Sequence, residues 1–254
     1  MSLWVIADTH LGFAIDKSMD IFGPRWADHS ARLATAWRQK VREEDTVLIP
    51  GDISWALKLS EAQADLAFLD ALPGQKILLR GNHDFWWQSR SKIESSFSEW
   101  GLSSLRLLQN DAIFLPAEES IICGSRLWLL PSDPKAQAQD KKIFQRELSR
   151  LDLSLQVAQR LREQVAQEGL SPRLIAILHY PPFAPDLIPR EVSQRLEAAA
   201  VERAYFGHIH QVKSPYRGVE RKIGQVFYSL IAADQIDFCP HLIPPRTREE
   251  SICQ

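Results

Sequence analysis

The sequence has few cysteines, no long apolar run and no excess of one charge. Its three cysteines, Cys123, Cys239 and Cys253, lie far apart and form no metal-binding or redox spacing. We therefore expect a reduced, cytoplasmic setting. The longest apolar runs are well short of the roughly 20 residues that cross a membrane, so we expect no membrane contact. The apolar start lacks a basic flank and reaches Asp8 too soon for a signal peptide.

The charge balance gives no sign of a polyanion as the main partner. The 254 residues include 30 basic and 32 acidic side chains, for a net charge of −2. We see no internal repeat and no low-complexity tract. The length suits one large α/β domain or two small ones, and we expect a single domain over 1–254. The sequence gives no oligomeric state.

Five apolar segments are typical of buried strands, and each is followed by polar side chains. The segments span 3–7, 46–49, 77–79, 174–178 and 204–206. The side chains that follow them are Asp8, His10, Asp52, Asn82, His83, His179, His208 and His210. Five of the seven histidines fall in these turns, which chance placement explains poorly. Because the carboxyl ends of parallel strands converge at one edge, we expect these side chains to meet there.

Each motif alone is weak evidence for a site. Asp52 follows a glycine, and Gly81-Asn82 is a common loop pair, so polar turns explain either motif equally well. Asp8 and His10 are two residues apart and so point the same way in an extended segment. A carboxylate beside an imidazole is half of a site for a first-row metal.

The other segments predict a scaffold. We expect helices over 28–41, 60–72, 89–100 and 140–168, a hairpin of 112–115 with 121–123, and a strand over 226–231. The helix over 140–168 is amphipathic and is expected to be scaffold or a lid, with a partner-binding helix as the alternative. Residues 237–254 contain Pro240, Pro244 and Pro245, and are predicted to form an extended tail.

The polar motifs together resemble a known family. In order, they are Asp8-x-His10, Gly51-Asp52, Gly81-Asn82-His83-Asp84, His179 and Gly207-His208-x-His210. This is the motif set of the calcineurin-like metallophosphoesterases. Residues 51–87 are similar to a bacterial subgroup of predicted phosphohydrolases in that superfamily. The resemblance implies an α/β fold, a four-layer α/β/β/α sandwich, with a centre that holds two divalent metal ions.

The resemblance also implies a division of the ligands. One metal would bind Asp8, His10 and His210, and the other Asn82, His179 and His208, with Asp52 as the bridge between them. Imidazole and carboxylate ligands favour Mn, Fe or Zn over Ca.

The implied activity is metal-dependent hydrolysis of a small phosphomonoester or phosphodiester by attack of a metal-bridging hydroxide. His83 is the motif histidine without a metal, so we assign it as general acid, with Asp84 as an orienting partner. Arg80 would steady the loop or the phosphate, against the alternative of a surface salt bridge. Arg126 is a further phosphate candidate.

Departures from the family pattern limit the substrate. The Ser/Thr protein phosphatases of this family carry Asp-Arg-Gly at the second motif. Here Asp52 is followed by Ile53-Ser54-Trp55, so the phosphate-binding arginine of those enzymes is missing. A nuclease or nucleotide phosphodiesterase of the same fold is the second hypothesis, although nucleic acid is the less favoured partner. A non-catalytic binding module is the third and least favoured hypothesis. Such proteins typically lose metal ligands, and here every ligand position is filled. Trp55, Trp86 and Trp87 either stack on a substrate ring or, as we favour, pack beneath the loops.

Overall fold

The structure is a computed structural model that describes residues 1–15, 19–184, 186–188, 190–210 and 220–246. Its α-helices are α1 (His29–Lys40), α2 (Leu59–Asp70), α3 (Arg90–Trp100), α4 (Ala138–Ala166) and α5 (Glu191–Ala198). Its strands are β1 (Leu3–Val5), β2 (Thr46–Pro50), β3 (Gln75–Leu79), β4 (Leu105–Leu107), β5 (Ile113–Leu115), β6 (Ser120–Ser125), β7 (Arg173–Leu178), β8 (Val201–Phe206), β9 (Arg221–Ile223), β10 (Val226–Leu230) and β11 (His241–Leu242). Short 3-10 helices are η1 (Met19–Phe22), η2 (Pro24–Trp26), η3 (Pro116–Glu118) and η4 (Ala233–Gln235).

The described strands form two sheets whose central strands are parallel. One sheet has the order β11-β1-β2-β3-β4 and the other β5-β6-β7-β8-β10-β9. Strands β1 to β4 pair in parallel, as do β6, β7, β8 and β10, while β5, β9 and β11 are antiparallel at the edges. The near-continuous apolar composition of β2 and β7 fits this arrangement, because strands in such sheets are covered on both faces.

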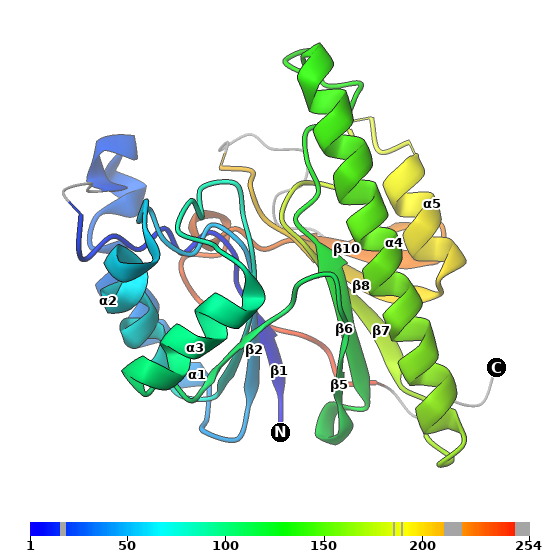
Figure 1. Ribbon diagram of the computed structural model, residues 1–254, viewed down its shortest axis with the longest axis horizontal. Coiled ribbons are helices and arrows are strands. Elements are labelled where there is room, and N and C mark those ends of the chain that lie inside the picture. Colours follow the sequence, from blue (N-terminus) through cyan, green and yellow to red (C-terminus); the bar gives the residue numbers. More distant parts are fainter. Residues whose placement is uncertain (16–18, 185, 189, 211–219, 247–254) are drawn as a thin grey trace.

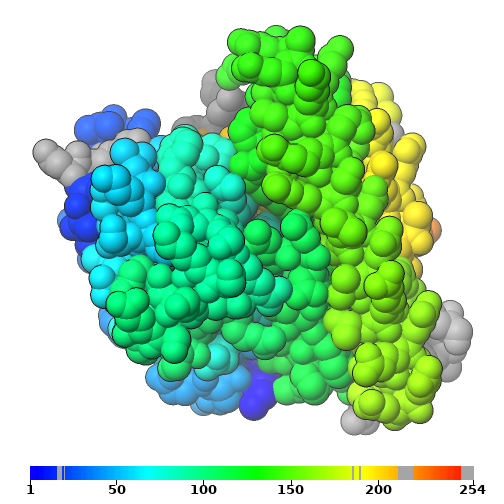
Figure 2. Space-filling view, viewed as in Figure 1, coloured from blue at the N-terminus to red at the C-terminus, as the bar shows by residue number. Residues whose placement is uncertain are grey.

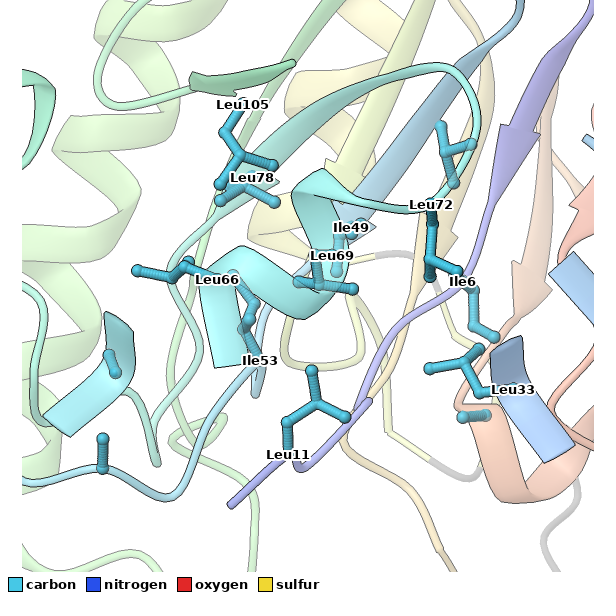
Figure 3. Packing of buried hydrophobic residues seen from close by; sticks show 14 of the residues in the cluster. Ile6, Leu11, Leu33, Ile49, Ile53, Leu66, Leu69, Leu72, Leu78 and Leu105 are labelled. Atoms are coloured by element: carbon cyan, nitrogen blue, oxygen red, sulfur yellow. The ribbon is translucent and has the colours of Figure 1, made fainter. Parts of the chain in front are cut away.

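The sheets lie face to face between two layers of helices, which confirms the predicted four-layer α/β/β/α sandwich (Figure 1). Alternate residues of β2 face opposite layers: Leu48 lies in the core between the sheets, and Ile49 packs towards the helices. Figure 3 shows this outer core, in which Leu66 and Leu69 of α2 lie near Ile49. On the other side, the apolar face of α4 covers the second sheet, as the 140–168 pattern predicted for a scaffold helix.

A backbone junction joins the sheets at the ends of β1 and β10. The Ala7 N–H donates to the carbonyl of Ile231 at 2.9 Å, and the Ala233 N–H donates to the carbonyl of Ala7 at 2.9 Å. Asp8, the residue after Ala7, therefore lies at the end of β1 directly beside the second sheet. The junction fixes the position of the polar loops that follow β1 and β10.

The prediction of an extended tail from Asp237 is wrong for the part that the structure describes. Phe238 and Ile243 are fully buried, and β11 pairs antiparallel with β1. These contacts hold the segment as an edge strand of the first sheet. Residues 247–254, with Cys253, lie outside the described residues. Across the described residues, the helices are too short or too polar to cross a membrane.

Candidate metal centre

The strand-end side chains form two adjacent groups suited to metal binding. One group contains Asp8, His10 and His210, and the other Asp52, His179 and His208. Within each group the ligand-grade atoms all lie within 4.8 Å of one another. Asn82 joins the second group, because its Oδ1 lies 2.7 Å from His179 Nε2. The structure thus brings together all seven residues that the sequence predicted as ligands.

Asp52 lies between the two groups. Its Oδ1 accepts a hydrogen bond from the His83 N–H at 2.8 Å. Its Oδ2 is buried and, across the part of the chain that the structure describes, accepts no hydrogen bond of standard geometry, yet it lies 3.8 Å from His10 Nε2 and 3.4 Å from His179 Nε2. A buried carboxylate oxygen without a donor is costly, and a shared cation would remove that cost. The donor set therefore fits two cations with Asp52 as the shared ligand.

The loops adopt strained backbone to present these side chains. Asp8, His10, Asp52 and His208 all have positive φ, at 59°, 44°, 51° and 70°. Such conformations cost about 1–3 kcal/mol each and cluster at functional sites. At position 207 only glycine fits, because a Cβ there would lie 2.2 Å from Asp8 Oδ2. The same loop donates the His208 N–H to Asp8 Oδ2 at 2.9 Å, which fixes the carboxylate.

Burial and mutual charge shift the pKa values of the centre. Burial raises the pKa of Asp8 to about 7 and lowers the pKa of His208 to about 3. Burial alone would lower the pKa of His179, but the Asp52 charge outweighs it and raises that pKa to about 9. Burial likewise opposes ionisation of Asp52, yet His179 and His10 hold its pKa below the usual range. Metal binding at His179 must therefore displace a proton, so it should strengthen as the pH rises.

Asp234 is a partner of the centre that the sequence analysis missed. Its Oδ1 accepts a hydrogen bond from His210 Nδ1 at 2.8 Å, and the Arg25 guanidinium lies 3.1 Å from its Oδ2. This contact leaves His210 Nε2 directed at the ligand group, the usual arrangement for a metal-binding imidazole. Burial lowers the pKa of His210, but the Asp234 hydrogen bond outweighs it and raises that pKa. The signal was present, since Asp234 closely follows the predicted strand over 226–231.

Aromatic rings also support the ligands. The His10 ring stacks on Trp55 with 4.9 Å between centroids, and the His208 ring lies 4.0 Å from that of Tyr180. Trp26 meets His10 and His210 edge to face, at 5.6 and 5.5 Å. Neither Trp26 nor Tyr180 was predicted, because no spacing links either residue to its histidine.

The tryptophans of the ligand loops lie beneath those loops, as the sequence analysis favoured. Trp55, Trp86 and Trp87 are 8%, 0% and 7% exposed. Trp55 also lies 4.2 Å from the ring of His83, between ring centroids. His83 is partly buried beside the ligand groups, 5.8 Å from His10.

Asp84 joins the ligand loops to one another. It is fully buried and accepts backbone hydrogen bonds from Ile53 and Ser54 at Oδ1 and from Gly81 at Oδ2. The Trp86 indole N–H also donates to it at 3.0 Å. These contacts fix the Asp52 loop against the Asn82 loop. The predicted orienting action of Asp84 on His83 stays a prediction.

Arg80 lines a separate cavity with Arg126. Burial and the neighbouring Arg126 lower the pKa of Arg80. Arg126 donates to Glu147 at 2.8 Å and lies over the Trp128 ring. The catalytic role of Arg80 stays a prediction.

Comparison with known proteins agrees with this geometry. The family model described as calcineurin-like phosphoesterase matches residues 1–212. The chain belongs to this family. The match covers all the ligand loops, so membership and the two ligand groups together support a metal-dependent phosphoesterase. The resemblance drawn from the motifs is thereby confirmed.

Individual relatives are more distant. The chain is 39% identical over 84 residues to the Gene 66 protein of Mycobacterium phage D29, over 33% of this chain and 40% of that protein. It is 36% identical over 81 residues to the Gene 66 protein of Mycobacterium phage L5, over 32% of this chain and 39% of that protein. The chain thus spans about two fifths of these relatives' lengths. A solved protein of unknown function from Aquifex aeolicus is 18% identical, with a TM-score of 0.46 and 95% coverage of each chain.

The Asp234 contact predicts the effect of a conservative substitution. In Asp234→Asn, the charged partner of His210 is lost, so metal affinity should fall about 10–100-fold. Titration with Mn²⁺ by calorimetry measures this change. Arg25→Gln is the matched control, because it removes the ion pair of Asp234 with Arg25 and leaves the His210 hydrogen bond in place. Equal affinities in Asp234→Asn and the wild type would exclude the supporting role of Asp234.

Proposed function

We propose that the protein hydrolyses a small phosphomonoester or phosphodiester at a centre of two divalent cations. The observation that carries the proposal is Asp52 Oδ2, a buried carboxylate oxygen that lies between the two ligand groups and accepts no hydrogen bond of standard geometry from the described residues. Asp8, His10 and His210 would hold one cation, and Asn82, His179 and His208 the other. The ligand types favour Mn, Fe or Zn.

Two cations held there would attract the phosphoryl oxygens and lower the pKa of a water molecule at the centre. The protein supplies rigid ligands for this purpose. Backbone N–H groups fix both carboxylates of the centre: that of His208 donates to the two oxygens of Asp8, and that of His83 donates to Asp52 Oδ1. Fixed ligands need little reorganisation during the reaction, which is the main source of electrostatic stabilisation in enzymes.

His83 is the proton donor of the proposal. Its backbone N–H bonds Asp52 Oδ1, so the loop that carries the imidazole is tied to the shared ligand. Its ring packs against Trp55, which in turn stacks on His10. The imidazole is thereby held beside both ligand groups. From there it protonates the leaving oxygen of the ester.

Substitution of the shared ligand tests the two-cation arrangement. In Asp52→Asn, Oδ1 can still accept from His83, but an amide nitrogen replaces the oxygen that both cations would share. We expect the bound metal to fall at both positions, measured by elemental analysis of the purified protein. Asp65→Asn is the control, since Asp65 is equally buried but bonds Ser54 and Phe13, outside both groups. Two metals per chain in Asp52→Asn would contradict the shared role.

Activity is tested with two esters side by side. We expect hydrolysis of p-nitrophenyl phosphate or bis-p-nitrophenyl phosphate with added Mn²⁺, and its loss with a chelator. The faster ester indicates whether the enzyme is a monoesterase or a diesterase. Cleavage of single-stranded DNA in place of either ester would favour the nuclease. Absence of turnover on all three substrates by metal-loaded protein would contradict the proposal.

His83→Ala separates proton donation from metal binding. The variant should retain its metals and lose about 10²–10⁴-fold in turnover on esters with poor leaving groups. Turnover of p-nitrophenyl phosphate should fall less, because its leaving group needs little protonation. A Brønsted series of aryl phosphates measures the difference. An equal loss across the series would remove His83 from the acid role.

A further inference from the structure

A cavity lined by Arg80 and Arg126 lies where the two sheets and α4 meet. Its volume is about 80 Å³, several times the 10–15 Å³ that one water needs. The residues that line it come from the ends of β3 and β6, from the loops after β3 and β4, and from α4. Figure 2 shows the segment that contains α3 beside α4 on the face of the molecule that is also seen in Figure 1.

Chain connections place this cavity close to the proposed metal centre. Arg80 lies two residues before the ligand Asn82. The carbonyl of Arg126 accepts a hydrogen bond from the N–H of Tyr180, next to the ligand His179. Both arginines line the cavity. The cavity is therefore built on the same strand ends as the centre.

The charge of the cavity is strongly positive. Arg80, Arg126 and Arg150 line it, together with a single carboxylate, that of Glu147. Glu147 is 1% exposed and already serves two of the three, since its Oε1 lies 2.8 Å from Arg126 Nη2 and 2.7 Å from Arg150 Nη1. The cavity residues thus carry a net charge of two, with Arg126 10% exposed and Arg150 38% exposed, and a bound anion would offset this charge.

Unused donors accompany this charge. The Nε atoms of Arg80 and Arg126 are buried and have no hydrogen-bond partner among the described residues. The three arginines of the cavity come from separate elements, and their guanidinium groups line the same small space. A tetrahedral phosphate accepts donors from several directions, whereas a planar carboxylate is served by a single fork.

We propose that this cavity binds a phosphate-type oxyanion, separately from any phosphoryl group at the metal centre. The anion is either a second phosphoryl group of the substrate or free phosphate. Both sources present the same oxygens to Arg80, Arg126 and Arg150. Binding of inorganic phosphate in the cavity does not depend on hydrolysis and is tested separately from the proposed function; only the assignment of the anion to the substrate rests on that function.

Calorimetric titration of the metal-loaded protein with inorganic phosphate tests the proposal. The wild type should bind phosphate in the cavity in addition to any binding at the metals. Arg150→Gln should weaken the cavity site at least about tenfold, because it removes a charged donor. Arg146→Gln is the matched control: Arg146 lies on the same helix and 3.6 Å from the same Glu147, but does not line the cavity. Binding at the metals is common to all three proteins and cancels in the comparison.

A second variant guards against misfolding. If circular dichroism shows that Arg150→Gln is unfolded, Arg150→Lys keeps the charge and loses the fork, and should still weaken the cavity site. Phosphate binding that is identical in the wild type, the folded Arg150 variant and Arg146→Gln would overturn the proposal. In that case the arginines serve only to attach α4 to β6 through Glu147.

Competition against p-nitrophenyl phosphate distinguishes the two sources. Adenosine 3′,5′-bisphosphate and adenosine 5′-monophosphate are compared as inhibitors in the wild type and in Arg150→Gln. If the anion belongs to the substrate, the bisphosphate should inhibit more tightly in the wild type, and Arg150→Gln should abolish that preference. If the anion is free phosphate, calorimetry should still detect phosphate binding in the cavity. Arg150→Gln should then change the inhibition by the two nucleotides to the same extent.

Discussion

The buried charge at the edge of the two sheets is the constraint on which this structure depends. Asp8, Asp52 and His179 are 0%, 1% and 0% exposed, and their ligand atoms crowd together with those of three other histidines. Burying so many ionisable groups is unfavourable unless opposite charge compensates them. Inside the centre, Asp52 compensates only part of this cost by raising the pKa of His179. Bound cations would compensate the rest, and metal binding would then be coupled to folding.

This constraint explains why the centre requires both sheets. Asp8, His10, Asp52 and Asn82 follow strands of the first sheet, and His179, His208 and His210 follow strands of the second. Either sheet alone would hold an incomplete set of ligands. The apolar core between the sheets and the Ala7 junction therefore do more than stabilise the fold, because they fix the separation of the two half-sets. Several of these residues have positive φ, so the loops adopt strained backbone in order to place their side chains across that separation.

The sequence predicted which side chains meet at this edge because of a regularity of parallel sheets. A buried strand reads as an apolar run, its carboxyl end is marked by the first polar residue, and such ends converge. Asp234 obeys the same regularity, yet its partner is a histidine 24 residues earlier, and no local pattern reveals that contact. Trp26 and Tyr180 were missed for the same reason. The segment after Asp237 was misread because its prolines suggest a tail, while the burial of Phe238 and Ile243 depends on tertiary packing.

The distribution of positive charge links the centre to the arginine cavity. The chain has a net charge of −2, so it offers no general attraction to phosphates. The guanidiniums of Arg80 and Arg126 are nevertheless held at the strand ends that also carry the ligands Asn82 and His179. Local positive charge in a recess raises the concentration of anions there even when the whole surface is slightly acidic. The net charge of the whole sequence does not show that arginines cluster at one place in the fold. For that reason composition alone favoured no anionic partner. The folded arrangement leads to the opposite expectation at this one edge.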